Sequence, residues 1–200
     1  ATGSGGGSVS CMGPTVSQRR PVREWASHPF FSASSGESAE TATATPVPSS
    51  SVTEDFESGG WSGGSGWNNA WARSNTSNTA IITTGGPQAG SQHARIVSNA
   101  SITRTLSLAG YSSATLSFWA KASSWEGRRF LRAADGAVVQ VSLNNSNWTT
   151  LKTFTDGFDT NTYQQFQLNV NAYAGQPTVY VRFLGQMNAT DDYLYVDSIQ

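Results

Sequence analysis

Apolar and polar residues alternate in the chain after residue 50, in short runs separated by clusters of Gly, Asn, Asp and Ser. Such runs are typical of half-buried β-strands, because successive side chains of a strand point to opposite faces of a sheet. The pattern predicts about ten strands, near 52–57, 80–84, 94–97, 102–108, 114–122, 138–143, 148–154, 163–170, 178–184 and 193–199. No run has a convincing helical stripe, so a parallel α/β fold is disfavoured.

The alternation also assigns faces within single strands. In the run TVYVRFLG the two valines and the phenylalanine share one face, opposite Tyr180, Arg182 and Leu184. In the run DYLYVDSI, Asp197 shares a face with the two tyrosines. Leu194, Val196 and Ser198 lie on the opposite face. Each strand is therefore expected to bury one side and expose the other.

Composition fits one all-β domain with an appendage. Only 12% of the 200 residues are charged, whereas Gly, Ser, Thr and Asn are abundant, a mix that favours strands and turns over surface helices. We predict an antiparallel two-sheet jelly-roll β-sandwich over residues 51–200. A low-complexity N-terminal arm or linker over residues 1–50 precedes it.

The net charge of -1 argues against nucleic acid as a partner, because phosphate binding needs clustered Lys and Arg. No stretch reaches the roughly 18 apolar residues of a transmembrane helix, so we expect no membrane span. The single cysteine, Cys11, cannot form an internal disulfide, which leaves the core or a metal ion as the source of stability. We expect an extracellular or cell-surface protein whose leader has been removed.

The N-terminal arm contains candidate anchors for assembly. Its segments ATGSGGGSVS and TATATPVPSSS are linker-like, but Trp25, Phe30 and Phe31 in VREWASHPFF are too apolar for a plain spacer. Val9 and Cys11 alternate with serines, as strand addition to a neighbouring sheet requires. The alternatives are a disordered tail with an apolar patch or an ordinary interdomain linker.

The order of several short signatures resembles a known group of domains. The segments are DFESGGWS, SQHARIVS, TRTLSLAGYSSATLSFWAKASS, VQVSLNNSNWTTLKTF and DDYLYVDSIQ. Together they resemble the MAM-like and related carbohydrate-binding jelly rolls that serve as accessory modules of secreted proteins. The disulfide cysteines of animal receptor MAM domains and the paired acidic residues of jelly-roll glycosidases are absent from this sequence.

The resemblance implies a structural Ca²⁺ between the first strand and the last. The matching positions are Glu57 in DFES and Asp197 in YVDSI, together with Asp55, Asp191 or Asp192 and with backbone carbonyls. Calcium suits such a set because it accepts six to eight oxygen ligands in irregular geometry. The alternative is that these carboxylates end strands and bind backbone N–H groups.

Tryptophans in loops are the candidate ligand-binding residues. Trp67 and Trp71 lie in a region rich in Gly, Ser and Asn, and Trp125 follows a predicted strand end. Flat aromatic faces stack on sugar rings, so we expect these three side chains to reach the surface and bind a glycan.

Asn-x-Ser/Thr sequons are frequent, and they fit a glycosylated exported surface. They occur at Asn75, Asn99, Asn144, Asn147 and Asn188.

Catalysis is not expected. His93 is the only histidine after residue 50, and no nucleophile motif accompanies it, so a hydrogen-bonded strand histidine is the favoured reading.

These observations favour a non-catalytic extracellular structural module over an enzyme. We expect a homo-oligomer or fibre, or a surface layer, in which the N-terminal arm adds as a strand to a neighbouring copy. The alternative function is a carbohydrate-binding accessory module of a secreted enzyme or adhesin.

Overall fold

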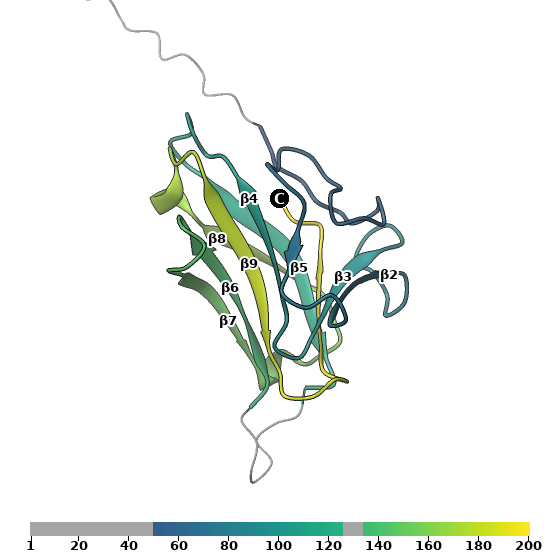
Figure 1. Cartoon of the computed structure of the whole chain (residues 1–200). Helices are drawn as coiled ribbons and strands as arrows, with labels where there is room; N and C mark the ends of the chain where they lie inside the picture. The colour runs from purple at the N-terminus through teal and green to yellow at the C-terminus, as the bar shows by residue number, and fades with distance from the viewer. Residues whose placement is uncertain (1–49, 126–133) are drawn as a thin grey trace, which may run out of the picture. The chain divides into compact units, whose positions relative to one another are not determined.

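The computed structural model describes residues 50–125 and 134–200 of the chain. These residues form two antiparallel β-sheets of five strands each, which lie face to face (Figure 1). We name each sheet after its central strand. The β9 sheet has the order β1-β4-β9-β6-β7, with β1 (Ala72–Arg73), β4 (Ser101–Leu106), β6 (Gly136–Ser142), β7 (Thr149–Thr155) and β9 (Val179–Gln186). The β10 sheet has the order β2-β3-β10-β5-β8, with β2 (Thr79–Ile82), β3 (His93–Val97), β5 (Thr115–Ser123), β8 (Gln164–Asn169) and β10 (Tyr193–Asp197).

The predicted all-β jelly-roll sandwich is confirmed, and each strand expected from residue 80 onward is present within a few residues of its expected place. The short strand β1 at the edge of the β9 sheet has no counterpart among the predicted runs. Two 3-10 helices, η1 (Asp156–Phe158) and η2 (Asn171–Tyr173), join strands of the described part.

The first expected strand, 52–57, is wrong in its extent. Thr53 and Glu54 each make only a single bridge, to Ser65 and Ile199 respectively. The run ends at Phe56, whose φ of 61° lies in the left-handed region and turns the backbone away from an extended path.

The core lies between the two sheets, where the apolar faces of the strands meet. Its largest fully buried apolar side chains include Phe56, Ile96, Ile102, Phe118, Phe183, Met187, Leu194 and Ile199. The faces predicted for the run TVYVRFLG are confirmed, because Val179, Val181 and Phe183 belong to this core. Tyr180 and Arg182 are therefore left on the outer side of the β9 sheet.

A buried ion pair ties the start of the domain to the β9 sheet. The Arg104 guanidinium donates through Nη1 to Glu54 Oε2 at 2.5 Å, with only 4% and 0% of these side chains exposed. The Glu54 carboxylate also accepts from Trp71 Nε1 at 3.1 Å and from the Phe56 amide at 2.9 Å. Burial lowers the pKa of Arg104, which the charge of Glu54 partly offsets. Each charge thus has a partner of opposite sign, without which its burial in the core would be strongly unfavourable.

Strand β7 forms one edge of the β9 sheet and contains a β-bulge. Val139 of β6 faces Lys152, whereas Gln140 faces Thr150, so the register skips Leu151. One extra residue on β7 therefore interrupts the regular ladder beside β6.

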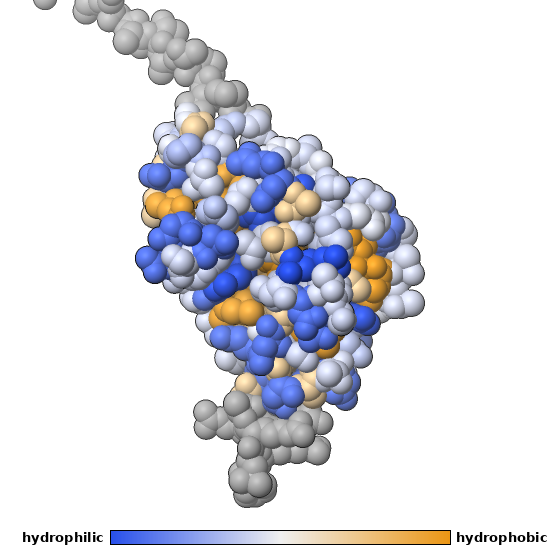
Figure 2. All heavy atoms as spheres, in the orientation of Figure 1, coloured by the Kyte–Doolittle hydropathy of each residue, from blue (hydrophilic) through white to orange (hydrophobic). Residues whose placement is uncertain are grey.

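The surface of the described domain is mainly hydrophilic. In Figure 2, residues coloured orange form small separate groups among blue and white ones. Leu143 is the one large apolar side chain of the described ranges that counts as exposed. Within these ranges no helix has the length and apolar character needed to cross a membrane.

Candidate functional site

The outer face of the β9 sheet carries a group of polar and aromatic side chains. Strand β9 contributes Arg182, strand β6 contributes Gln140 and strand β7 contributes Thr150, while Trp148 directly precedes β7. The register places Gln140 opposite both Arg182 and Thr150, which brings three neighbouring strands together at one point. We call these four residues the Trp148 cluster.

Hydrogen bonds and stacking hold the Trp148 cluster in one arrangement. Both Nε and Nη2 of Arg182 donate to Gln140 Oε1, at 3.0 and 2.5 Å, and Gln140 Nε2 donates to Thr150 Oγ1 at 3.0 Å. The Arg182 Cζ atom lies 3.8 Å from the centroid of the Trp148 ring. An aromatic ring stacked on a guanidinium in this way is a cation–π contact. The cluster therefore presents an indole that its neighbours already orient.

The Arg182 guanidinium has no anionic partner among the residues that the structure describes, where Glu54–Arg104 is the ion pair found. Desolvation by burial lowers the pKa of Arg182. The guanidinium remains charged at neutral pH because its ordinary pKa lies far above 7. It has donors left over for a ligand that approaches from solvent, since a guanidinium carries five N–H groups.

A hollow of about 250 Å³ lies over strand β4, and one of its lining residues, Thr103, is the register partner of Arg182. Its lining also includes Asn69, Arg73, Arg104, Asn145 and Tyr180. The hollow thus offers amides, hydroxyls, a phenol and two guanidinium groups on the side of Arg182. Groups of these kinds hydrogen-bond the hydroxyls of a sugar, while the aromatic ring covers its apolar face.

The three tryptophans predicted to bind a ligand have other places. Trp71 and Trp125 are 3% and 6% exposed, so the expectation that they reach the surface is wrong. Trp71 is buried because its ring packs beside Phe183 and its Nε1 donates to Glu54. The ring of Trp125 packs against Phe158 of η1.

Trp67, the third candidate, is half-buried and lines a hollow at the end of the sandwich, and its ring centroid lies 5.0 Å from Arg104 Cζ. Its Nε1 donates to the Thr53 carbonyl at 3.0 Å, and its ring lies beside Trp71 with centroids 5.2 Å apart. Its role in ligand binding stays a prediction.

The predicted metal ligands Glu57 and Asp197 accept hydrogen bonds from the backbone. Glu57 Oε1 accepts from the amides of residues 91 and 92, at 2.9 and 2.7 Å, and these bonds lower its pKa. Asp197 Oδ2 accepts from the amides of residues 88 and 89, at 2.9 and 3.3 Å, while burial raises its pKa. Asp192 Oδ2 accepts from the amide of Ala189 at 3.0 Å. The three carboxylates therefore organise loops in the way that the alternative to a metal site expects.

No group of three or more His, Cys, Asp or Glu side chains in the described ranges is placed to hold a metal ion. Calcium also accepts backbone carbonyl oxygens as ligands, so a site built on Glu57 and Asp197 stays a prediction. A bound ion would stabilise the folded state, so the melting temperature of the purified protein should fall by several degrees when EDTA replaces CaCl₂ in the buffer. Differential scanning calorimetry checks this, and an unchanged melting temperature would contradict the site.

The sequon residues Asn75, Asn99, Asn144, Asn147 and Asn188 are all exposed, and their glycosylation stays a prediction. Val9, Cys11, Trp25, Phe30 and Phe31 of the arm lie outside the described residues.

His93 is a buried strand histidine, as expected. Its Nε2 lies 2.8 Å from the Thr84 carbonyl and its Nδ1 lies 2.5 Å from the Tyr163 hydroxyl. Burial lowers the pKa of His93, so the ring is neutral at neutral pH. Both ring nitrogens of His93 therefore have hydrogen-bond partners within the domain.

Sequence reasoning missed the Trp148 cluster, although one signal pointed to it. Alternation in the run VQVSLNN puts Gln140 on the side away from the apolar valines, as it does for Arg182 in TVYVRFLG. Neither run shows that β6 and β9 are neighbours, because that pairing joins residues 42 positions apart. The cluster is therefore visible only once the sheet order is known.

Comparison with known proteins agrees with the fold. No protein-family model and no curated protein matches the chain. Among solved structures, TmCBM61 in complex with β-1,4-galactotriose superposes with a TM-score of 0.50 and 11% identity, over 72% of this chain and 91% of that one. The K1 cleaved adhesin domain of Lys-gingipain from Porphyromonas gingivalis W83 gives a TM-score of 0.50 and 13% identity, over 75% and 96% of the two chains. The described domain thus has the β-sandwich fold found in carbohydrate-binding modules and adhesin domains.

Proposed function

We propose that residues 51–200 form a non-catalytic, carbohydrate-binding accessory module of a secreted enzyme or adhesin, and that the ligand binds on the outer face of the β9 sheet. The observation that carries the proposal is the Trp148 cluster, in which an indole is stacked on Arg182, and a hollow lined by amides, hydroxyls and two arginines follows on the neighbouring strand β4. A glycan is the ligand whose chemistry matches both parts of this face.

Preorganisation supports this face as a binding site. Arg182 is fixed by two hydrogen bonds to Gln140, so little side-chain freedom remains to be lost when a ligand binds. Tyr180 and Trp148 are half-buried, which leaves part of each ring accessible to solvent. The structurally similar TmCBM61 was solved with a bound galactotriose, which is consistent with a sugar ligand on this fold.

The absence of acids near the cluster favours binding over hydrolysis. Neither the Trp148 cluster nor the adjoining hollow includes Asp or Glu among the described residues. Glycoside hydrolysis generally needs two carboxyl groups about 5 to 10 Å apart. The exposed sequons and the polar surface are consistent with an extracellular location.

Assembly into a fibre by strand addition stays a prediction from the arm sequence. The similar solved structures favour the carbohydrate-binding alternative, and the arm residues lie outside the described ranges.

A glycan array probed with the full chain tests the proposed function. We expect wild-type protein to bind at least one class of polysaccharide. Trp148→Ala should weaken that binding about 10- to 100-fold, the range seen when an aromatic residue central to a binding site is truncated. Affinity electrophoresis in gels containing the polysaccharide measures the difference.

Trp119→Ala is the matched control for this experiment. Trp119 is a half-buried tryptophan of β5 in the opposite sheet, so its loss should leave glycan affinity unchanged. An array without hits would reject a glycan ligand, and a Trp148→Ala variant that binds as well as wild type would reject this face as the site.

A further inference from the structure

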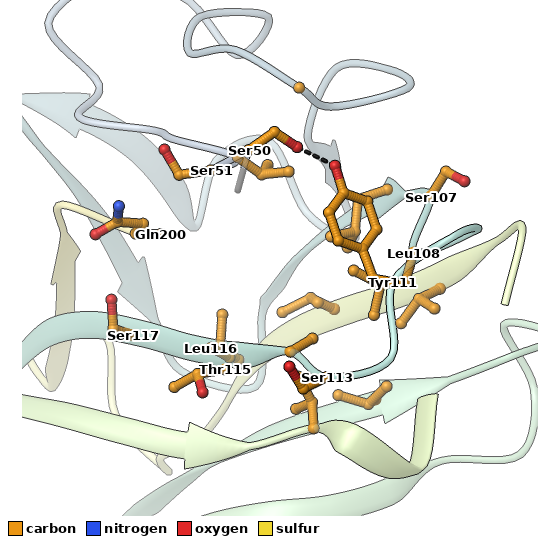
Figure 3. A pocket seen from close by; sticks show the side chains of 18 of the residues that line it. Ser50, Ser51, Ser107, Leu108, Tyr111, Ser113, Thr115, Leu116, Ser117 and Gln200 are labelled. Atoms are coloured by element: carbon orange, nitrogen blue, oxygen red, sulfur yellow. Dashed lines mark hydrogen bonds between the residues drawn. The ribbon is translucent and has the colours of Figure 1, made fainter. Parts of the chain in front are cut away.

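A second hollow lies at one end of the sandwich, between the two sheets. It has a volume of about 500 Å³ and is bounded by the last residues of β4 and β6, the first residues of β5 and β9, and the segment that enters the domain at Ser50 (Figure 3). We call it the end pocket. Its volume falls within the range of about 300–1,000 Å³ that is typical of small-molecule sites.

The interior of the end pocket is apolar. Leu108, Leu116, Val141 and Val179 line it, and each belongs to the buried core. The hollow opens to solvent at its rim, and these apolar side chains face it. An apolar ligand would cover them and make dispersion contacts with them.

The rim of the end pocket is polar but uncharged. Figure 3 shows hydroxyl-bearing side chains around the opening, with the Tyr111 hydroxyl hydrogen-bonded to Ser50 and the Gln200 amide on another side. None of the residues that line the pocket is Asp, Glu, Lys, Arg or His. A charged ligand would lose its hydration there without an ionic partner, so the lining selects a neutral molecule.

From this lining we propose that the end pocket binds an uncharged amphiphile, whose apolar chain lies between the sheets and whose hydroxyl group remains at the rim. The residues that line this site include no member of the Trp148 cluster or of the hollow over β4. The half-buried Trp67 lines the end pocket, which gives this predicted ligand-binding residue a ligand of a different class from a sugar.

Titration of the full chain with 1-hexanol, 1-octanol and 1-decanol tests this site. Each added methylene that is buried should tighten binding about fourfold. Decanoate, which has a similar chain but a charged head, should bind at least tenfold more weakly than 1-decanol. Tryptophan fluorescence follows binding through Trp67, and isothermal titration calorimetry gives the affinities.

Three substitutions in one short segment provide two tests of the end pocket and one control. Ala114→Phe places a ring in the end pocket and should weaken 1-decanol binding at least tenfold, and so should Ser113→Phe at its exposed rim. Ser112→Phe changes an exposed neighbour that does not line the pocket, so it should bind like wild type. If Ala114→Phe fails to fold by circular dichroism, the comparison between the two serine variants decides.

The outcomes separate this site from the glycan face. Affinity that does not rise with chain length, or that survives both pocket substitutions, would overturn the end pocket as a ligand site. Equal affinity for decanoate and 1-decanol would overturn the selection of neutral ligands. Glycan affinity should be unchanged in all three variants, so failure of one site leaves the test of the other intact.

Discussion

Replacing Arg104 with methionine should lower the free energy of unfolding by about 3–5 kcal/mol, the usual effect of removing one partner from a buried ion pair. The substitution keeps the length of the side chain but leaves the Glu54 carboxylate without its cation in a site where none of that side chain is exposed. The Trp71 and Phe56 donors to Glu54 remain, and two neutral donors cannot replace the lost charge. Urea denaturation followed by tryptophan fluorescence measures the change.

The double variant Glu54→Gln/Arg104→Met is the informative control for that experiment. It removes both charges, although the single amide oxygen of glutamine can keep only one of the hydrogen bonds that Phe56 and Trp71 donate to the two carboxylate oxygens. We still expect it to be more stable than Arg104→Met alone, because an unpaired buried charge costs more free energy than one lost hydrogen bond between neutral groups. If Arg104→Met lowers the free energy of unfolding by less than about 1 kcal/mol, the ion pair is well solvated in solution.

Truncation of Phe183 to alanine should also reduce stability by about 3–5 kcal/mol, as is typical for a phenylalanine in a close-packed core. The Phe183 side chain is fully buried, and its ring lies 5.0 Å from that of Phe118 in the opposite sheet and 6.2 Å from that of Trp71, centroid to centroid. Its loss would open a cavity at the contact between the two sheets. Thermal and urea denaturation measure the effect.

Leu184→Ala serves as the matched control for Phe183→Ala. Leu184 is the next residue of β9, is half-buried and lies on the outer face of the sheet, so its truncation should cost about 1 kcal/mol or less. Equal losses at the two positions would contradict the assignment of faces along β9.

Alternation predicted the strands and the two faces of β9, because it is a local property of a half-buried sheet, whereas in β10 both the face of Tyr195 and that of Leu194 are buried. Val181 and Arg182 were assigned to opposite sides from neighbouring sequence alone, and the sheet bears this out. The jelly-roll fold followed from the resemblance of short motifs, and the similar solved structures share it.

The candidate sites were less predictable, because they depend on which distant segments meet. Trp71 is in a region whose composition predicts an exposed loop, but its indole donates a hydrogen bond to the buried Glu54 carboxylate. That carboxylate is paired with Arg104, which lies 50 residues further along the chain. Similarly, Trp148 gains its role from Arg182 on another strand. No local pattern contains either contact.

The bulge in β7 affects how the domain can meet other chains. An edge strand with a regular, flat ladder invites another extended chain to pair with it, whereas an extra residue and a lysine on the edge discourage this. The skipped Leu151 and the adjacent Lys152 provide both features at the free side of the β9 sheet. Copies of this domain that are held close together would thereby be protected on this side from joining into continuous sheets.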